Sequence, residues 1–164
     1  MKRYLVLFFS IIGLIVLTGC AGSSDKNSKI EAEEMIKVEN WKESPLFESN
    51  NFSMIGEEGR AGFIYENNEV DRFYTNRINK YMWHFWGSEE EFSGAFQVIG
   101  THEKSKEPIV VVPEREGQSS LSPNNGADHH IPSNMALPKK GLWKLEAVID
   151  SKIIGTVFVE VHEK

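Results

Sequence analysis

The residues best suited to chemistry lie within a short polar stretch that contains two amides, a carboxylate and two adjacent imidazoles. Imidazole and carboxylate groups are ligands for Zn²⁺ or Cu²⁺. Met82, His84 and Met135 add ligand types that suit copper. No HExxH or other fixed metal spacing is present, so a metal site requires ligands from several segments to converge. Hydrogen bonds to the domain's own backbone are the alternative role. The stretch supplies five candidate site residues: Asn124, Asn125, Asp128, His129 and His130.

Arrangements for nucleophilic or acid–base catalysis are absent from the sequence. Ser119, Ser120 and Ser122 lie near the histidines, but no G-x-S-x-G elbow surrounds them. The three consecutive acids Glu89–Glu91 point in different directions and are typical of a solvated turn. No glycine-rich phosphate loop occurs. We therefore expect a protein that is not an enzyme and that needs no cofactor.

An aromatic segment from Lys80 to Trp86 offers a different kind of site. Its residues alternate as in a strand, with Tyr81, Trp83 and Phe85 on one face and Met82, His84 and Trp86 on the other. In a sandwich only one of these faces belongs to the core. Outward aromatic rings can stack on sugars or receive a partner's side chains. Met82, His84 and Trp86 are therefore binding candidates, unless loops cover that face as well.

The N-terminus has the pattern of a secretion signal. Lys2 and Arg3 precede the thirteen-residue apolar run Leu5–Leu17. A spanning helix needs about 20 apolar residues, whereas a signal peptide needs fewer. The run ends in Leu17-Thr18-Gly19-Cys20, which resembles the lipobox of bacterial lipoproteins.

The lipobox resemblance implies that Cys20, the single cysteine, receives a diacylglyceryl thioether and becomes the first residue of the mature chain. Two acyl chains give stable membrane anchoring where one is marginal. We expect a signal peptide over residues 1–19, a lipidated cysteine and flexible Gly/Ser-rich tether over 20–44, and a β-sandwich domain over 45–164. The expected location is the extracytoplasmic face of the cell membrane.

Charge restricts the partners further. The chain carries 18 basic and 24 acidic side chains, a net charge of −6. Loss of residues 1–19 removes Lys2 and Arg3 and no acid, which leaves 16 basic and 24 acidic side chains and a net charge of −8. A nucleic-acid binder needs a basic face, so nucleic acid is excluded as a partner.

Short segments with a period of two follow one another from residue 45 to the end of the chain, and they predict an all-β, antiparallel sandwich. The stretch Glu114–Lys140 lacks this pattern and is expected to form a long loop, with a turn at Asn124-Asn125-Gly126. Ser88–Phe92 is expected to be a turn or one helical turn. The predicted strands are 52–55, 61–65, 80–86, 96–101, 109–112, 142–149 and 153–162.

The segments 138–148 and 155–161, which overlap the last two predicted strands, resemble the closing hairpin of immunoglobulin-like domains in extracytoplasmic bacterial proteins. Taken whole, the chain resembles a family of small, uncharacterised lipoproteins from Gram-positive bacteria. The segments Lys80–Gly87, Pro123–Pro132 and Gly141–Lys144 carry that resemblance. It implies an immunoglobulin-like fold and a membrane location, and it brings no catalytic residues.

Together these features predict a lipid-anchored, non-enzymatic binding or accessory module for an envelope component, either a protein or a cell-wall glycan. Anchoring raises the local concentration at the membrane, so a modest affinity suffices. The alternative is a metal-binding lipoprotein that holds Zn²⁺ or Cu²⁺ through the Asp128–His130 segment.

Overall fold

Ten strands and one helical turn make up the part of the chain that the computed structural model describes, residues 41–115 and 122–164. The predictions for Cys20, for residues 20–40 and for Ser119 and Ser120 lie outside this part. No helix within it is long and apolar enough to cross a membrane. The elements are β1 (Leu46–Ser49), β2 (Phe52–Glu57), β3 (Ala61–Ile64), β4 (Phe73–Tyr74), β5 (Asn79–Phe85), the 3₁₀ turn η1 (Glu89–Phe92), β6 (Phe96–His102), β7 (Pro108–Arg115), β8 (His129–Met135), β9 (Gly141–Ile149) and β10 (Lys152–His162).

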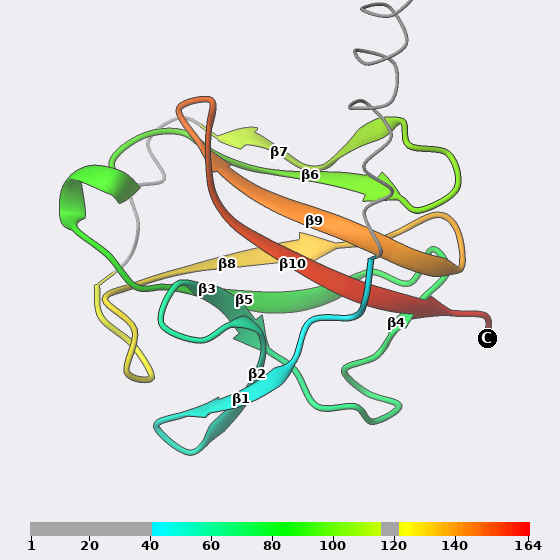
Figure 1. The fold of residues 1–164 in the computed structure, drawn as a ribbon, viewed down its shortest axis with the longest axis horizontal. Coiled ribbons are helices and arrows are strands. Elements are labelled where there is room, and N and C mark those ends of the chain that lie inside the picture. The colour runs from blue at the N-terminus through cyan, green and yellow to red at the C-terminus, as the bar shows by residue number, and fades with distance from the viewer. Residues whose placement is uncertain (1–40, 116–121) are drawn as a thin grey trace, which may run out of the picture. The chain divides into compact units, whose positions relative to one another are not determined.

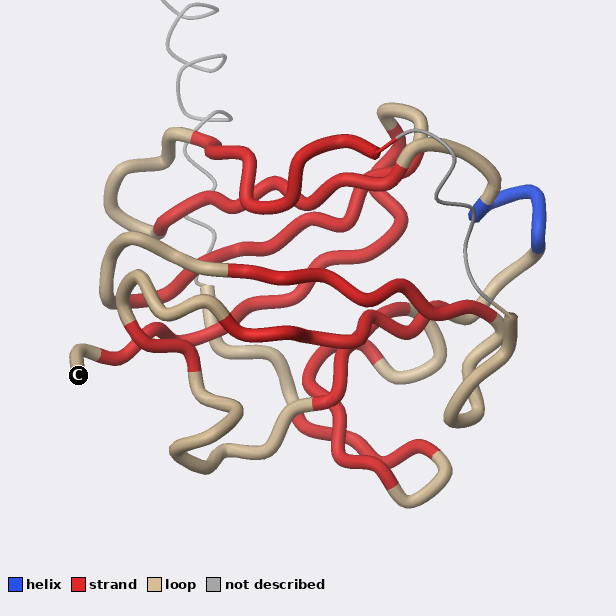
Figure 2. The backbone as a smooth tube through the Cα atoms, turned by 180° about the vertical axis from the view of Figure 1, so that it is seen from behind, coloured by secondary structure: helices blue, strands red, loops and turns tan. Residues whose placement is uncertain are grey.

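The strands form two five-stranded sheets that pack face to face (Figure 1). One sheet has the order β1-β2-β3-β5-β8, and the other has the order β4-β10-β9-β6-β7. Every pair is antiparallel except β4 with β10, which run parallel. Figure 2 shows the two layers from behind, with η1 at one end. The predicted all-β sandwich is confirmed, and so is the helical turn at Ser88–Phe92.

The neighbour relations follow those of immunoglobulin sandwiches. If β3, β5 and β8 are taken as strands A, B and E, they form one sheet in that order. With β6, β7, β9 and β10 as strands C, C′, F and G, the second sheet has the order G-F-C-C′. β1 and β2 are additions beside strand A. The chain has this order without the disulfide of antibody domains, because its single cysteine cannot form an intrachain disulfide.

Aromatic side chains fill the space between the sheets. Tyr81, Trp83 and Phe85 of β5 are each no more than 3% exposed. The Phe63 ring meets Trp83 edge-on at 4.9 Å, and Phe73 stacks on Tyr81 at 4.3 Å. The opposite sheet contributes alternating side chains of β9 and β10, namely Trp143, Leu145, Ala147, Ile149, Val157, Val159 and Val161, all of them buried.

The predicted loop over Glu114–Lys140 is wrong in its second half, where the structure contains β8. This strand pairs with β5, and His130 lies opposite His84. Ile131, Ser133 and Met135 of β8 are buried and alternate with more exposed neighbours. Within the sheet β8 has only one neighbour, so Pro132, which cannot donate a ladder hydrogen bond, is tolerated. His129 and His130 therefore belong to a strand and not to a loop.

The folded domain also begins earlier than Pro45. The ring of Trp41 meets Phe158 of β10 at 5.3 Å. The N–H of Ser44 donates to the carbonyl of Phe158, and the Ser44 hydroxyl accepts from the N–H of the same residue. Residues 41–44, which the sequence assigns to the tether, thus pack against β10.

The two sheets approach each other closely where Gly155 of β10 meets Ala61 of β3. A Cβ at position 155 would lie 2.2 Å from the Cβ of Ala61, whereas its next neighbours are 3.7 Å away or more. Gly155→Ala should therefore overpack the core and lower the free energy of unfolding by about 1–3 kcal/mol, measured by urea denaturation.

The matched control moves the methyl group from one sheet to the other. In the double variant Ala61→Gly/Gly155→Ala the clashing Cβ is gone, so stability should recover relative to Gly155→Ala alone. If the double variant is less stable than Gly155→Ala, the contact between Ala61 and Gly155 does not set the spacing of the sheets.

A candidate cleft beside a closed aromatic face

The second face of the aromatic strand β5 is covered in the structure. Met82 and Trp86 are half-buried, and His84 is completely buried. None of the three belongs to the core between the sheets, which takes Tyr81 and Trp83 instead. The sequence thus predicted the two faces of the strand but left open which one would be free. Neither face is free.

Two segments far apart in sequence cover this outer face. From β1, the ring of Phe47 meets Trp86 at 5.9 Å in an edge arrangement. From the other side, the turn Asn124–Ala127 closes on itself through two backbone hydrogen bonds of 3.1 and 2.9 Å. Its Gly126 carbonyl accepts the indole N–H of Trp86 at 2.8 Å. Asn125 and Gly126 have φ values of 50° and 84°, as a type I′ turn requires, so the predicted turn is confirmed.

His84 is held in one neutral form by its neighbours. Its Nδ1 lies 2.9 Å from the carbonyl of Met82, which can only accept, so Nδ1 carries the hydrogen. Its Nε2 then accepts from the side-chain amide of Asn125 at 3.2 Å. Burial lowers the pKa of the ring, and nearby His130 lowers it further, whereas the Met82 carbonyl raises it. Both nitrogens of His84 are therefore occupied within the protein.

Asp128 and His130 also bond to the backbone. Oδ2 of Asp128 accepts from the N–H of Gly87 at 3.0 Å. Nδ1 of His130 lies 2.6 Å from the carbonyl of Ser122. The His129 ring packs on Phe92 with centroids 4.6 Å apart. The structure thus brings the predicted site residues together around β5, where the side chains of Asn125, Asp128 and His130 hydrogen-bond to His84 or to the backbone.

A metal site would need at least three ligands close together. The rings of His84 and His130 lie 6.3 Å apart. Within residues 41–115 and 122–164, however, no group of three or more histidine, cysteine, aspartate or glutamate side chains converges on one point. The metal-binding alternative has no ligand set in this part of the chain.

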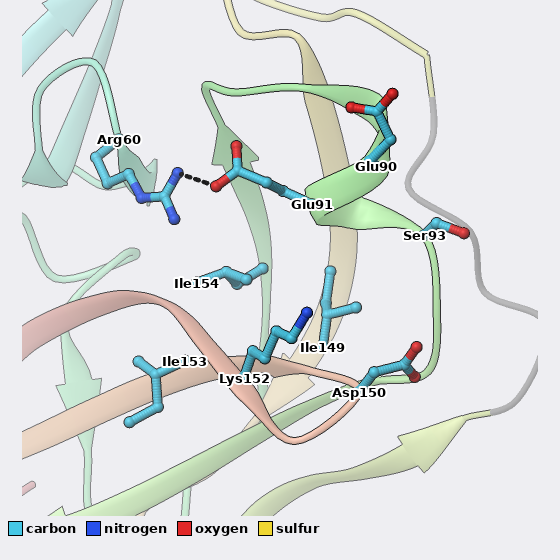
Figure 3. Close-up of a pocket in the computed structure, with 9 residues that line it drawn as sticks. All are labelled: Arg60, Glu90, Glu91, Ser93, Ile149, Asp150, Lys152, Ile153 and Ile154. Atoms are coloured by element: carbon cyan, nitrogen blue, oxygen red, sulfur yellow. Dashed lines mark hydrogen bonds and ion pairs between the residues drawn. The ribbon is translucent and has the colours of Figure 1, made fainter.

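An open cleft lies beside this covered face, where η1 meets the turn between β9 and β10 (Figure 3). Its volume is about 440 Å³, within the range of small-molecule sites. Ile149 and Ile154, both nearly buried, and the exposed Ile153 supply its apolar surface. The remaining lining residues are polar or charged: Arg60, Glu90, Glu91, Ser93, Asp150 and Lys152.

The charged groups of the cleft differ in how well they are satisfied. Nη1 of Arg60 donates to Oε1 of Glu91 at 3.1 Å, and Oε2 of Glu91 accepts from the N–H of Ser88 at 3.1 Å. The Ser88 N–H and then the Arg60 guanidinium lower the pKa of the Glu91 carboxyl. Oδ1 of Asp150 accepts from the N–H of Ala95 at 3.0 Å. Each oxygen of Glu91 thus has a partner, and Asp150 accepts from the backbone that follows η1.

Lys152 differs from these groups. Its ammonium has no hydrogen bond or ion pair within the described residues, and Figure 3 shows it pointing from the β9–β10 turn toward η1. Only one of the guanidinium N–H groups of Arg60 is engaged with Glu91. The cleft therefore offers unused hydrogen-bond donors beside an isoleucine surface.

Comparison with known proteins places the chain among relatives of the same fold. A family model described as "Domain of unknown function (DUF4871)" matches residues 31–159. The chain belongs to this family. It is also similar to a crystal structure described as a "putative lipoprotein" from Bacillus anthracis, with 19% sequence identity and a TM-score of 0.56. The match covers 86% of this chain and 98% of that one, and it supports the fold. No curated protein matches the chain.

The cleft of this DUF4871 domain could not be located from its sequence. Arg60, Glu91 and Asp150 lie in three different turns, separated by 31 and 59 positions. Of the three, the turn at Glu89–Glu91 was predicted from the sequence. Only the pairing of β9 with β10 and the order of the sheets bring the three turns together.

Burial of His84 should make the stability of this DUF4871 domain depend on pH. The unfolded ring binds a proton below about pH 6.5, whereas the folded ring, with its lowered pKa, binds a proton only at lower pH. The free energy of unfolding should therefore fall as the pH drops below 6.5, with a contribution of up to about 1.4 kcal/mol per pH unit. Urea denaturation of wild type and His84→Gln between pH 5 and 8 should give a flatter curve for the variant. If His162→Gln flattens the curve as much, the slope does not come from His84.

Proposed function

We propose that this protein is a lipid-anchored, extracytoplasmic binding module of the bacterial envelope and that it is not an enzyme. The observation that carries the binding role is the open cleft at η1, where Lys152, which has no hydrogen bond or ion pair among the described residues, lies beside Ile149, Ile153 and Ile154. The lipobox at Cys20 supports the anchor, and the polar Gly22–Lys29 stretch supports a tether. The partner is an envelope protein or a cell-wall glycan.

The proposed binding surface differs from the one that the sequence favours. Met82, His84 and Trp86 are engaged with Phe47 and with the Asn124–Ala127 turn. A ligand would have to displace that cover before it could stack on Trp86. The cleft needs no such displacement, because Lys152 and Ile153 are already exposed.

The anchor is tested by fatty-acid labelling. Cells expressing the full chain are grown with an alkyne-labelled palmitate, and the purified protein is analysed for label and intact mass. Wild type should carry the label and begin at Cys20, whereas Cys20→Ala should carry none. Label on Cys20→Ala at the wild-type level would contradict acylation at this residue.

The binding role is tested with a photo-crosslinking amino acid in the membrane-anchored protein in intact cells. Benzoylphenylalanine at position 153, in the cleft, should give a discrete crosslinked species. The same residue at position 110 is the control, because Val110 is 60% exposed and Ile153 is 58% exposed, and Val110 does not line the cleft. Sensitivity of the adduct to protease or to glycan hydrolase separates a protein partner from a glycan. Equal yields at the two positions, or no adduct at 153, would remove the cleft as the binding surface.

A further inference from the structure

We infer that the cleft recognises an aliphatic carboxylate, best supplied by the C-terminal end of a peptide whose last residue has an aliphatic side chain. This inference rests on the binding role proposed above and specifies the ligand for the same cleft. The inference rests on three features of the cleft: the N–H donors of Lys152 and Arg60, the isoleucine surface, and the acids at the rim.

The donors suit a single carboxylate. Lys152 has no partner within the described residues, and Arg60 has free N–H groups in addition to the one that Glu91 accepts. Both oxygens of Glu91 are already occupied, by Arg60 and by the N–H of Ser88. A ligand carboxylate can therefore approach the donors of Lys152 and Arg60 without displacing an existing contact. Charge-assisted hydrogen bonds of this kind are about twice as strong as neutral ones.

The apolar part of the cleft suits a branched side chain. Ile149 is 2% exposed and Ile154 is 4% exposed, so both lie at the bottom, and Ile153 at 58% stands at the side. None of the described residues that line the cleft is aromatic, so they offer no stacking surface for a sugar ring. The lining thus favours an aliphatic group over a glycan.

The acids at the rim favour a peptide end over a simple fatty acid, because a peptide N–H can donate to a rim carboxylate and an acyl chain has no such donor. Glu90 and Asp150 line the same cleft and bring its charged side chains to three acids and two bases. A second anion on the ligand would be repelled, and a neutral or cationic remainder would be accepted. A peptide chain that carries its only negative charge at its C-terminus fits this arrangement.

The test follows the isoleucine methyl groups of the full-length protein in detergent by NMR, with ¹³C-methyl labelling. Added N-acetyl-alanyl-leucine should shift the methyl signals of Ile149, Ile153 and Ile154, and leave those of Ile64 and Ile131 in place. The C-terminal amide of the same dipeptide and N-acetyl-alanyl-serine should each bind about tenfold more weakly, because each lacks one of the two recognised groups. The aliphatic acid 4-methylpentanoate, offered separately, distinguishes a general carboxylate site from a peptide site.

Lys152→Gln should weaken binding of the free dipeptide about tenfold and leave binding of its amide unchanged. The matched control is Lys139→Gln, which removes an exposed lysine outside the cleft. Equal affinity for acid and amide, or an equal loss in both variants, would overturn the inference. A crosslink at position 153 without dipeptide binding would overturn the ligand class alone, whereas absence of the crosslink would remove the binding role itself.

Discussion

β5 carries large side chains on both faces, so the domain must bury the strand from both sides. Its inner face carries Tyr81, Trp83 and Phe85, which the opposite sheet covers. Its outer face carries His84 and Trp86, which a two-layer sandwich leaves exposed. Burying an aromatic side chain is worth about 2–3 kcal/mol, so a second cover is favourable. The additional strand β1 and the Asn124–Ala127 turn provide it.

The second cover determines which polar residues the domain needs. A turn that lies over a strand leaves backbone groups without ladder partners, and buried groups of this kind are costly unless they are bonded. Asp128 accepts the N–H of Gly87, and Asn125 donates to His84. Amide, carboxylate and imidazole groups therefore gather here because they can satisfy buried hydrogen-bond donors and acceptors. In this domain the partners are backbone atoms and one another.

The elements with a strict period of two could be predicted from the sequence, and the elements defined by pairing could not. The hairpin of β9 and β10 was readable because Trp143 and Leu145 alternate with polar residues and Asp150-Ser151 marks its turn. β8 was missed because Pro132 and the paired histidines hide the alternation of Ile131, Ser133 and Met135. The site was partly predictable. The sequence selected residues that do come together around β5, but the cover over them depends on Phe47, which nothing in the local sequence links to Trp86.

The cover over the outer face of β5 and the cleft are linked by hydrogen bonds, because residues Trp86–Ser88 contact both. The N–H of Trp86, whose ring lies under the cover, donates to the carbonyl of Arg60, whose guanidinium forms part of the cleft. One residue later Gly87 is bonded to Asp128, and the next residue, Ser88, is bonded to Glu91. Fixing the outer face of β5 therefore fixes the wall of the cleft. The polar residues that the sequence singled out, such as Asp128, hold this wall in position. The positions proposed to face the ligand are Lys152 and three isoleucines, which only the folded chain brings together.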